Sequence, residues 1–180
     1  HLDELLHLCR LTGVTRRDTV DGDFYVAKGA AKLPPVIDAY LDPASLPGIV
    51  MDDTKAKHSK GWTSGTGLKN YIGEHYRYAG ANSGATATYE ILVRESGKYD
   101  VRFAYQPHQN RASNAKVTVT WPGGSKTQTI NMKEAPPLKP SFISLGVFDL
   151  VAGKPVMVEI SAAGANGNIH SDAVQVLKAQ

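Results

Sequence analysis

Hydrophobic and polar residues alternate along most of the chain after residue 48, which is the spacing of half-buried β-strands. In the stretch 85–91, for example, every second residue is hydrophobic. Further strands, joined by short turns, are predicted at 99–105, 117–121, 126–132, 142–150, 156–161 and 173–178. Because strand follows strand without a helical pattern between them, we predict a mainly β fold, an antiparallel β-sandwich.

The first 47 residues have helical spacing instead. Apolar residues recur at positions 2, 5, 6 and 9 before Gly13, and a second short helix is predicted at 36–41. Two helices this short do not bury enough surface to fold alone. We therefore predict a helical segment or linker at 1–47, followed by a β-sandwich domain at 48–180. The first part either docks on the sandwich or is the tail of an upstream domain, and the start at His1 indicates a fragment of a longer polypeptide.

Composition narrows the classes of protein that the chain can represent. Hydrophobic residues make up 42% of the chain, which is enough for a core. No apolar stretch approaches the roughly 20 residues of a membrane span, and no basic stripe or motif indicates a nucleic-acid partner. The single cysteine, Cys9, excludes a disulfide framework and a cysteine-based zinc cluster. A group of basic residues predicts a solvated loop or, alternatively, a contact with an acidic polysaccharide: Lys55, Lys57, His58, Lys60 and Lys69.

The sequence offers little support for nucleophilic catalysis. Ser64, in the run 61–65, stands one position too late for a nucleophile elbow. The run His170-Ser171-Asp172 contains the residue types of a catalytic triad, but consecutive residues entering a strand point to opposite faces. We therefore expect no catalytic residues in this chain.

Three carboxylates are candidate metal ligands. Asp52 and Asp53 end the first predicted strand of the sandwich, and Asp172 begins the last one. The first and last strands of a sandwich often lie side by side, which would bring these side chains together, and carboxylate oxygens suit Ca²⁺. The alternative is that Asp52 and Asp172 accept backbone hydrogen bonds at the ends of their strands. A structural Ca²⁺ is the one cofactor that the sequence suggests.

Aromatic residues in predicted loops are candidate ligand-binding groups. Sugar rings stack on aromatic side chains, and their hydroxyl groups need fixed polar partners. The candidates of both kinds are Trp62, Tyr71, Tyr76, Arg77, Tyr78, Arg111 and Asn114. The tyrosines on alternating strand positions are instead predicted to be core residues: Tyr89, Tyr99 and Tyr105.

The order of several short motifs resembles that of the golvesin C-terminal and xanthan-lyase carbohydrate-binding-like domain. The similarity covers residues 48–178. It begins at Gly48-Ile49-Val50-Met51-Asp52-Asp53, then takes in Gly61-Trp62-Thr63-Ser64, Tyr71-Ile72-Gly73, Tyr76-Arg77-Tyr78, Ala85-Thr86-Ala87-Thr88-Tyr89, Gly97-Lys98-Tyr99-Asp100-Val101, Asn110-Arg111-Ala112-Ser113-Asn114-Ala115, Ser144-Leu145-Gly146-Val147-Phe148 and Ser171-Asp172-Ala173-Val174-Gln175-Val176.

This resemblance implies a galactose-binding-like jelly roll that is appended to secreted bacterial proteins. The domains that precede such modules include peptidases, polysaccharide lyases and FAD-dependent oxidoreductases. The resemblance also implies architectural roles for motif residues, with Arg111 and Asn114 fixing a loop and Asp172 tying the terminal strand. His75 departs from the family pattern, in which an acidic residue is common, and this argues against a metal ion at that position.

Two functions follow as expectations. The first is a non-catalytic, extracytoplasmic accessory module that binds a polysaccharide or cell-surface glycan. The alternative is a structural or interaction domain that packs on an upstream catalytic domain, and it predicts that Trp62 and Tyr71 are buried.

Overall fold

The computed structural model describes residues 14–19, 22–27 and 40–179. Within the first of two compact units, β1 (Val14–Thr19) pairs antiparallel with β2 (Gly22–Ala27). These strands correct the helical interpretation of the N-terminal part, where β-branched residues such as Thr15 and Val26 favour strands. The helix predicted at 2–11 lies outside the described residues.

The second compact unit runs from Asp38 to Gln180 and so begins ten residues before the predicted boundary at 48. Its first strand, β3 (Tyr40–Leu41), pairs in parallel with β7 (Tyr71–Ile72). The helix predicted at 36–41 is therefore wrong at Tyr40 and Leu41. Pairing with β7 and packing of Leu41 on a small core cluster that includes Ile72 outweigh the weak preference of so short a segment.

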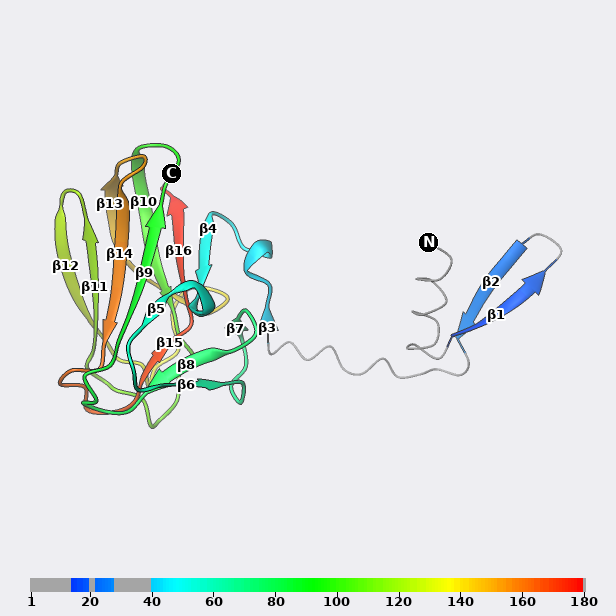
Figure 1. The fold of residues 1–180 in the computed structure, drawn as a ribbon, viewed down its shortest axis with the longest axis horizontal. Coiled ribbons are helices and arrows are strands. Elements are labelled where there is room, and N and C mark those ends of the chain that lie inside the picture. Colours follow the sequence, from blue (N-terminus) through cyan, green and yellow to red (C-terminus); the bar gives the residue numbers. More distant parts are fainter. Residues whose placement is uncertain (1–13, 20–21, 28–39, 180) are drawn as a thin grey trace. The chain divides into compact units, whose positions relative to one another are not determined.

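Two antiparallel sheets form the sandwich (Figure 1). One sheet has the strand order β13 (Phe142–Leu150), β10 (Gly97–Ala104), β16 (Ala173–Lys178) and β4 (Ile49–Asp52). The other has the order β12 (Gly124–Ile130), β11 (Ala115–Trp121), β14 (Pro155–Ser161), β9 (Thr86–Leu92) and β5 (Lys57–His58). The seven strands predicted from residue 85 onward are confirmed, with bounds that agree within two residues.

The core lies between these sheets and follows the alternation in the sequence. Tyr89 and Phe103 are fully buried, whereas Thr88 and Glu90 on β9 are not. The prediction that Tyr89, Tyr99 and Tyr105 are core residues is confirmed, because all three are buried. The first and last strands of the sandwich are also neighbours, as predicted, since Asp52 of β4 stands opposite Ala173 of β16.

A third, smaller sheet lies across one end of the sandwich (Figure 1). It consists of β15 (Ile169–Ser171), β8 (Tyr76–Ala79) and β6 (Trp62–Gly65), with β8 in the middle. Two short 3-10 helices, η1 (Pro43–Ser45) and η2 (Asp53–Lys55), flank β4. In the part of the chain that the structure describes, no helix is long and apolar enough to cross a membrane.

Candidate ligand-binding site

Three adjacent candidate residues lie on β8, the central strand of the end sheet, and their side chains point to its two opposite faces. Tyr76 and Tyr78 border a cavity on one face, whereas Arg77 between them pairs with Asp53 on the other. Successive side chains of a strand point to opposite faces, so this separation follows directly from the sequence Tyr76-Arg77-Tyr78. The three adjacent candidates therefore belong to two different environments.

The cavity beside Tyr76 and Tyr78 has a volume of about 440 Å³. This volume lies within the range of natural ligand pockets. Three stretches of chain supply its remaining lining residues, which are Gly67 and Leu68, His108, Asn110 and Arg111, and Asn168. We call it the Arg111 pocket.

Arg111 is a charged residue of the pocket lining, and only 5% of its surface is exposed. One guanidinium nitrogen donates to the side-chain oxygen of Asn110 at 2.8 Å, and its central carbon lies 5.6 Å from the centre of the Tyr78 ring. The Nε atom has no hydrogen-bond partner among the described residues. Burial lowers the pKa of Arg111 from its ordinary value, although a guanidinium remains protonated at any physiological pH.

Backbone and amide contacts hold the two loops that carry Arg111 and Asn168 together. The N–H of Asn168 donates to the carbonyl of Asn110 at 3.0 Å, and the N–H of Ala112 donates to the carbonyl of Asn168 at 2.8 Å. Asn114 does not line the pocket; its side chain bonds the Gly164 carbonyl at 3.0 Å and the Asn166 N–H at 2.8 Å. Its position matches the loop-fixing role that the family resemblance implies.

Trp62 and Tyr71 also lie outside the pocket lining. The Trp62 indole donates to the carbonyl of Thr86 at 3.0 Å, and its half-buried ring packs against the main core. Tyr71 is only 7% exposed and meets the ring of Tyr76 edge-on, with 5.8 Å between centroids. Tyr71 therefore contributes to the pocket indirectly, by packing against Tyr76, and Trp62 has a structural role.

On the other face of β8, Asp53 is fully buried between two basic side chains. Its carboxylate lies 3.2 Å from Nδ1 of His75 and 3.1 Å from Nε of Arg77. These contacts have the distances of ion pairs but not the alignment of hydrogen bonds. Burial raises the pKa of Asp53 to about 7, while His75 and Arg77 act in the opposite direction.

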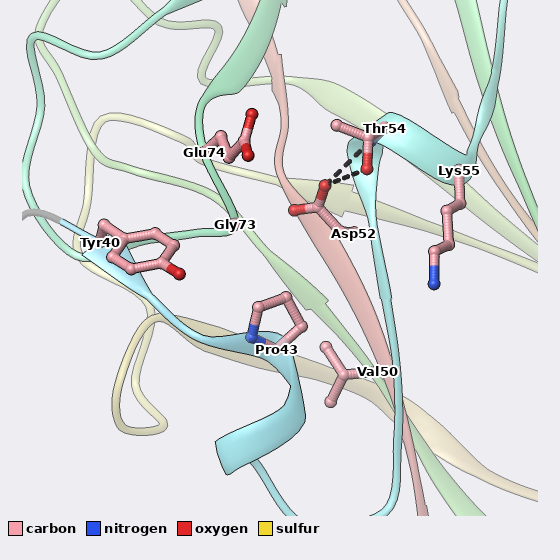
Figure 2. A pocket seen from close by; sticks show the side chains of 8 residues that line it. All are labelled: Tyr40, Pro43, Val50, Asp52, Thr54, Lys55, Gly73 and Glu74. Carbon is pink, nitrogen blue, oxygen red and sulfur yellow. Dashed lines mark hydrogen bonds between the residues drawn. The ribbon is translucent and has the colours of Figure 1, made fainter. Parts of the chain in front are cut away.

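Asp52 borders a second cavity of about 350 Å³ (Figure 2). One of its carboxylate oxygens caps η2 by accepting the N–H of Thr54 at 3.1 Å, and it also accepts the Thr54 hydroxyl. The other oxygen is buried without a partner. In the view of Figure 2, Glu74 lies to one side of Asp52 and Lys55 to the other, so two carboxylates and one ammonium group line this cavity.

Asp172 is tied to a different set of partners. Its oxygens accept the backbone N–H of Ile72 at 3.1 and 3.2 Å, and one accepts the amide of Gln106 at 2.8 Å. Asp52 and Asp172 thus accept backbone hydrogen bonds, as the alternative to metal binding expected. Among the described residues, no group of three His, Cys, Asp or Glu side chains is arranged to hold a metal ion. The three aspartates do not fit a shared Ca²⁺ site, and calcium binding stays a prediction.

The residues of the run 170–172 each have separate partners. Nδ1 of His170 accepts the backbone N–H of Gln106 at 3.3 Å, and the Ser171 hydroxyl lies 2.7 Å from that of Tyr89. All three residues of the run are buried. The structure therefore shows no proton relay from Asp172 through His170 to Ser171.

Sequence reasoning missed His108, Asn110 and Asn168, which complete the Arg111 pocket. The predicted strands place both regions in connections, because residues 106–116 lie between two of these strands and residues 162–172 between two others. Sequence spacing does not indicate that these two segments contact each other. The hydrogen bond between them joins Asn110 and Asn168, which are 58 positions apart.

The sandwich has the fold of solved carbohydrate-binding modules. A family 35 carbohydrate-binding module from Clostridium thermocellum is 17% identical with a TM-score of 0.50, over 73% of this chain and 98% of that one. A Podospora anserina β-(1,4)-mannanase with a family 35 module is 16% identical with a TM-score of 0.54, over 73% of this chain and 28% of that one. At these identities the likeness establishes the class of fold alone.

The chain belongs to the Golvesin C-terminal domain family, whose model matches residues 49–178. This confirms the family resemblance seen in the sequence. The solved xanthan lyase of Paenibacillus is 26% identical with a TM-score of 0.67 over 73% of this chain, which spans only 13% of that enzyme. No curated protein sequence matches the chain.

Proposed function

We propose that this domain is a non-catalytic module that binds a polysaccharide or cell-surface glycan in the Arg111 pocket. The observation that carries the proposal is the convergence of two tyrosines, an arginine and two asparagines at one open cavity. Tyrosine rings offer apolar faces to sugar rings, while amide and guanidinium groups offer hydrogen bonds to ring substituents. Such binding would raise the local concentration of an attached domain near its substrate without chemistry in this domain.

The similar structures support this proposal at the level of the module. Two of them contain carbohydrate-binding modules, and a third is a xanthan lyase. By analogy, the partners of this domain are a glycan and an upstream domain of the same polypeptide, such as a polysaccharide lyase or an FAD-dependent oxidoreductase. We place the protein outside the cytoplasm, where such a glycan is accessible.

Affinity electrophoresis tests the proposal. The chain is run through native gels that contain xanthan, polygalacturonate, alginate, galactomannan or xylan, and we expect retardation by at least one of them. Tyr78→Ala should abolish that retardation, whereas Tyr40→Ala should preserve it. Tyr40 is a suitable control because it is 51% exposed and lines the other cavity. Unchanged mobility of the folded chain in all five gels would exclude the proposal.

A second candidate function has one observation in its favour. Tyr71 is buried and Trp62 is half-buried with its indole N–H bonded, in line with the expectation of a domain that packs on its upstream neighbour. This function predicts no glycan binding but a stable association between the sandwich and the purified upstream domain. Size-exclusion chromatography of the two, mixed as separate chains, distinguishes it from the first.

A further inference from the structure

The buried and partly buried arginines of the sandwich differ in whether a carboxylate forms an ion pair with them. Arg77 pairs with Asp53, and Arg102 pairs with Asp100 at 2.6 Å. Arg111 is more deeply buried than either, yet no carboxylate of the described residues forms an ion pair with it. Its contacts are with the neutral amide of Asn110, the face of Tyr78 and the side chain of Tyr76.

A buried charge is costly unless a charge of opposite sign compensates for it. Arg111 has only 5% of its surface exposed, so water supplies little of this compensation. The cation–π contact with Tyr78 and the hydrogen bond to the Asn110 amide offset only part of the cost of desolvating the guanidinium. The remaining direction from which an anion can approach is the pocket that Arg111 lines.

The rest of the pocket suits an anion as well. None of its lining residues is acidic, and His108 adds a side chain that can donate a hydrogen bond. The cavity beside Asp52 differs, because two carboxylates, those of Asp52 and Glu74, line it together with one ammonium group, that of Lys55. An anionic ligand is therefore favoured at the Arg111 pocket and disfavoured at the other.

We infer that the Arg111 pocket selects an acidic sugar, whose carboxylate pairs with the Arg111 guanidinium while its hydroxyl groups bond the side chains of Asn168 and His108. This inference rests on the proposed function and narrows the glycan to one that contains uronic acid residues. A planar guanidinium matches a planar carboxylate through two parallel hydrogen bonds, which a neutral hydroxyl group cannot reproduce.

The test compares polymers that differ only in their carboxylates. The folded chain is titrated by affinity electrophoresis with polygalacturonate and with its fully methyl-esterified form, and likewise with xanthan and carboxyl-reduced xanthan. All gels contain EDTA, so that a bridging metal ion cannot supply the binding. We expect at least one acidic polymer to bind, its neutral counterpart to bind roughly 10- to 100-fold more weakly, and added salt to weaken the acidic interaction.

Two arginine variants complete the test. Arg111→Gln should lower the affinity for the acidic polymer to that for the neutral one, whereas Arg94→Gln should change it by less than about twofold. Arg94 is exposed and lies in the loop between β9 and β10, at the other end of the sandwich (Figure 1). Equal binding of the acidic and neutral polymers by the unaltered chain would overturn the inference and leave the proposed function standing. The absence of binding to any polysaccharide would overturn both.

Discussion

Two buried charged groups lie on opposite faces of β8 and differ in how they are compensated. Asp53 has two basic neighbours, His75 and Arg77, within 3.2 Å of its carboxylate. Arg111 has a neutral amide and two tyrosine side chains, Tyr76 and Tyr78, as neighbours, and it borders an open cavity. The first arrangement is complete within the protein, whereas the second lacks its counter-charge.

The difference separates a structural role from a binding role. An ion pair that the chain completes by itself holds elements together, here η2 against β8. A buried cation without a counter-charge lowers stability, and its retention is explained if a ligand supplies the missing charge. The comparison predicts that removing Asp53 harms folding, while removing Arg111 harms binding.

The largest expected effect is that of Asp53→Ala. At pH 8 this substitution leaves Arg77 and His75 without their partner and opens a small cavity, so we expect a loss of about 3 kcal/mol in the free energy of unfolding. Urea denaturation monitored by circular dichroism measures the loss. The exposed Asp149 is the matched control, for which Asp149→Ala should change stability by less than about 0.5 kcal/mol. Equal effects of the two substitutions would show that the Asp53 contacts contribute nothing.

A somewhat smaller loss is expected from Gly167→Ala. A Cβ atom at position 167 would lie 2.6 Å from the carbonyl oxygen of Arg111, so the two loops of the pocket must separate. Overpacking of this kind costs about 2 kcal/mol. Gly80→Ala serves as the control, because a Cβ there meets nothing within 4 Å. Thermal denaturation of both variants measures the effect, and a Gly167→Ala protein as stable as the control would show that the loops tolerate separation.

The sandwich itself was predictable from the sequence, while the assembly of the pocket was only partly so. Strict alternation within 85–91 fixes both the strand and its buried face, because a shift by one residue would expose every hydrophobic side chain. The same alternation separates Arg77 from Tyr76 and Tyr78, which the sequence reveals once β8 is recognised as a strand. The sequence alone was therefore sufficient to predict that these three residues do not share one site.

Other features depend on contacts that sequence spacing does not carry. His108 and Asn168 join the pocket through loops that meet across the end of the sandwich. Tyr71 was expected in a loop, yet a short strand pairing with Tyr40 places it in a buried position. Such short strands form because of tertiary pairing, and local propensity gives little warning of them.

The free energy of unfolding should depend on pH through the titration of Asp53. Burial raises its pKa from 3.8 to about 7, so between these values the folded state binds a proton more tightly than the unfolded state. The part of the free energy of unfolding that comes from protonation of Asp53 is therefore fully present below pH 3.8 and is lost as the pH rises through about 7, which leaves only the contacts of the ionised carboxylate at pH 8. His75, Arg77 and Asp52 face the same carboxylate and set the size of the effect.

Asp53→Asn removes this titration without removing the side chain. The difference in stability between the unaltered chain and the variant, measured by urea denaturation from pH 4 to pH 8, should fall with increasing pH. Taking this difference cancels the effects of other buried groups such as Asp172, whose pKa burial raises well above its ordinary value. A difference that stays constant across this range would contradict the raised pKa of Asp53.

The smallest expected effect on folding is that of Arg111→Met, and it is the most informative for the comparison. Methionine fills a similar volume without a charge, and replacing an uncompensated buried charge by an apolar side chain is often neutral or stabilising. We expect the free energy of unfolding to change by less than about 1 kcal/mol, because the lost contacts to Asn110 and Tyr78 offset the relief of desolvation. The same substitution at Arg77 is the matched control and should cost about 2 kcal/mol, since it leaves Asp53 without one of its two basic partners. If Arg111→Met were the more damaging of the two, Arg111 would be part of the framework, and the contrast between the two faces of β8 would fail.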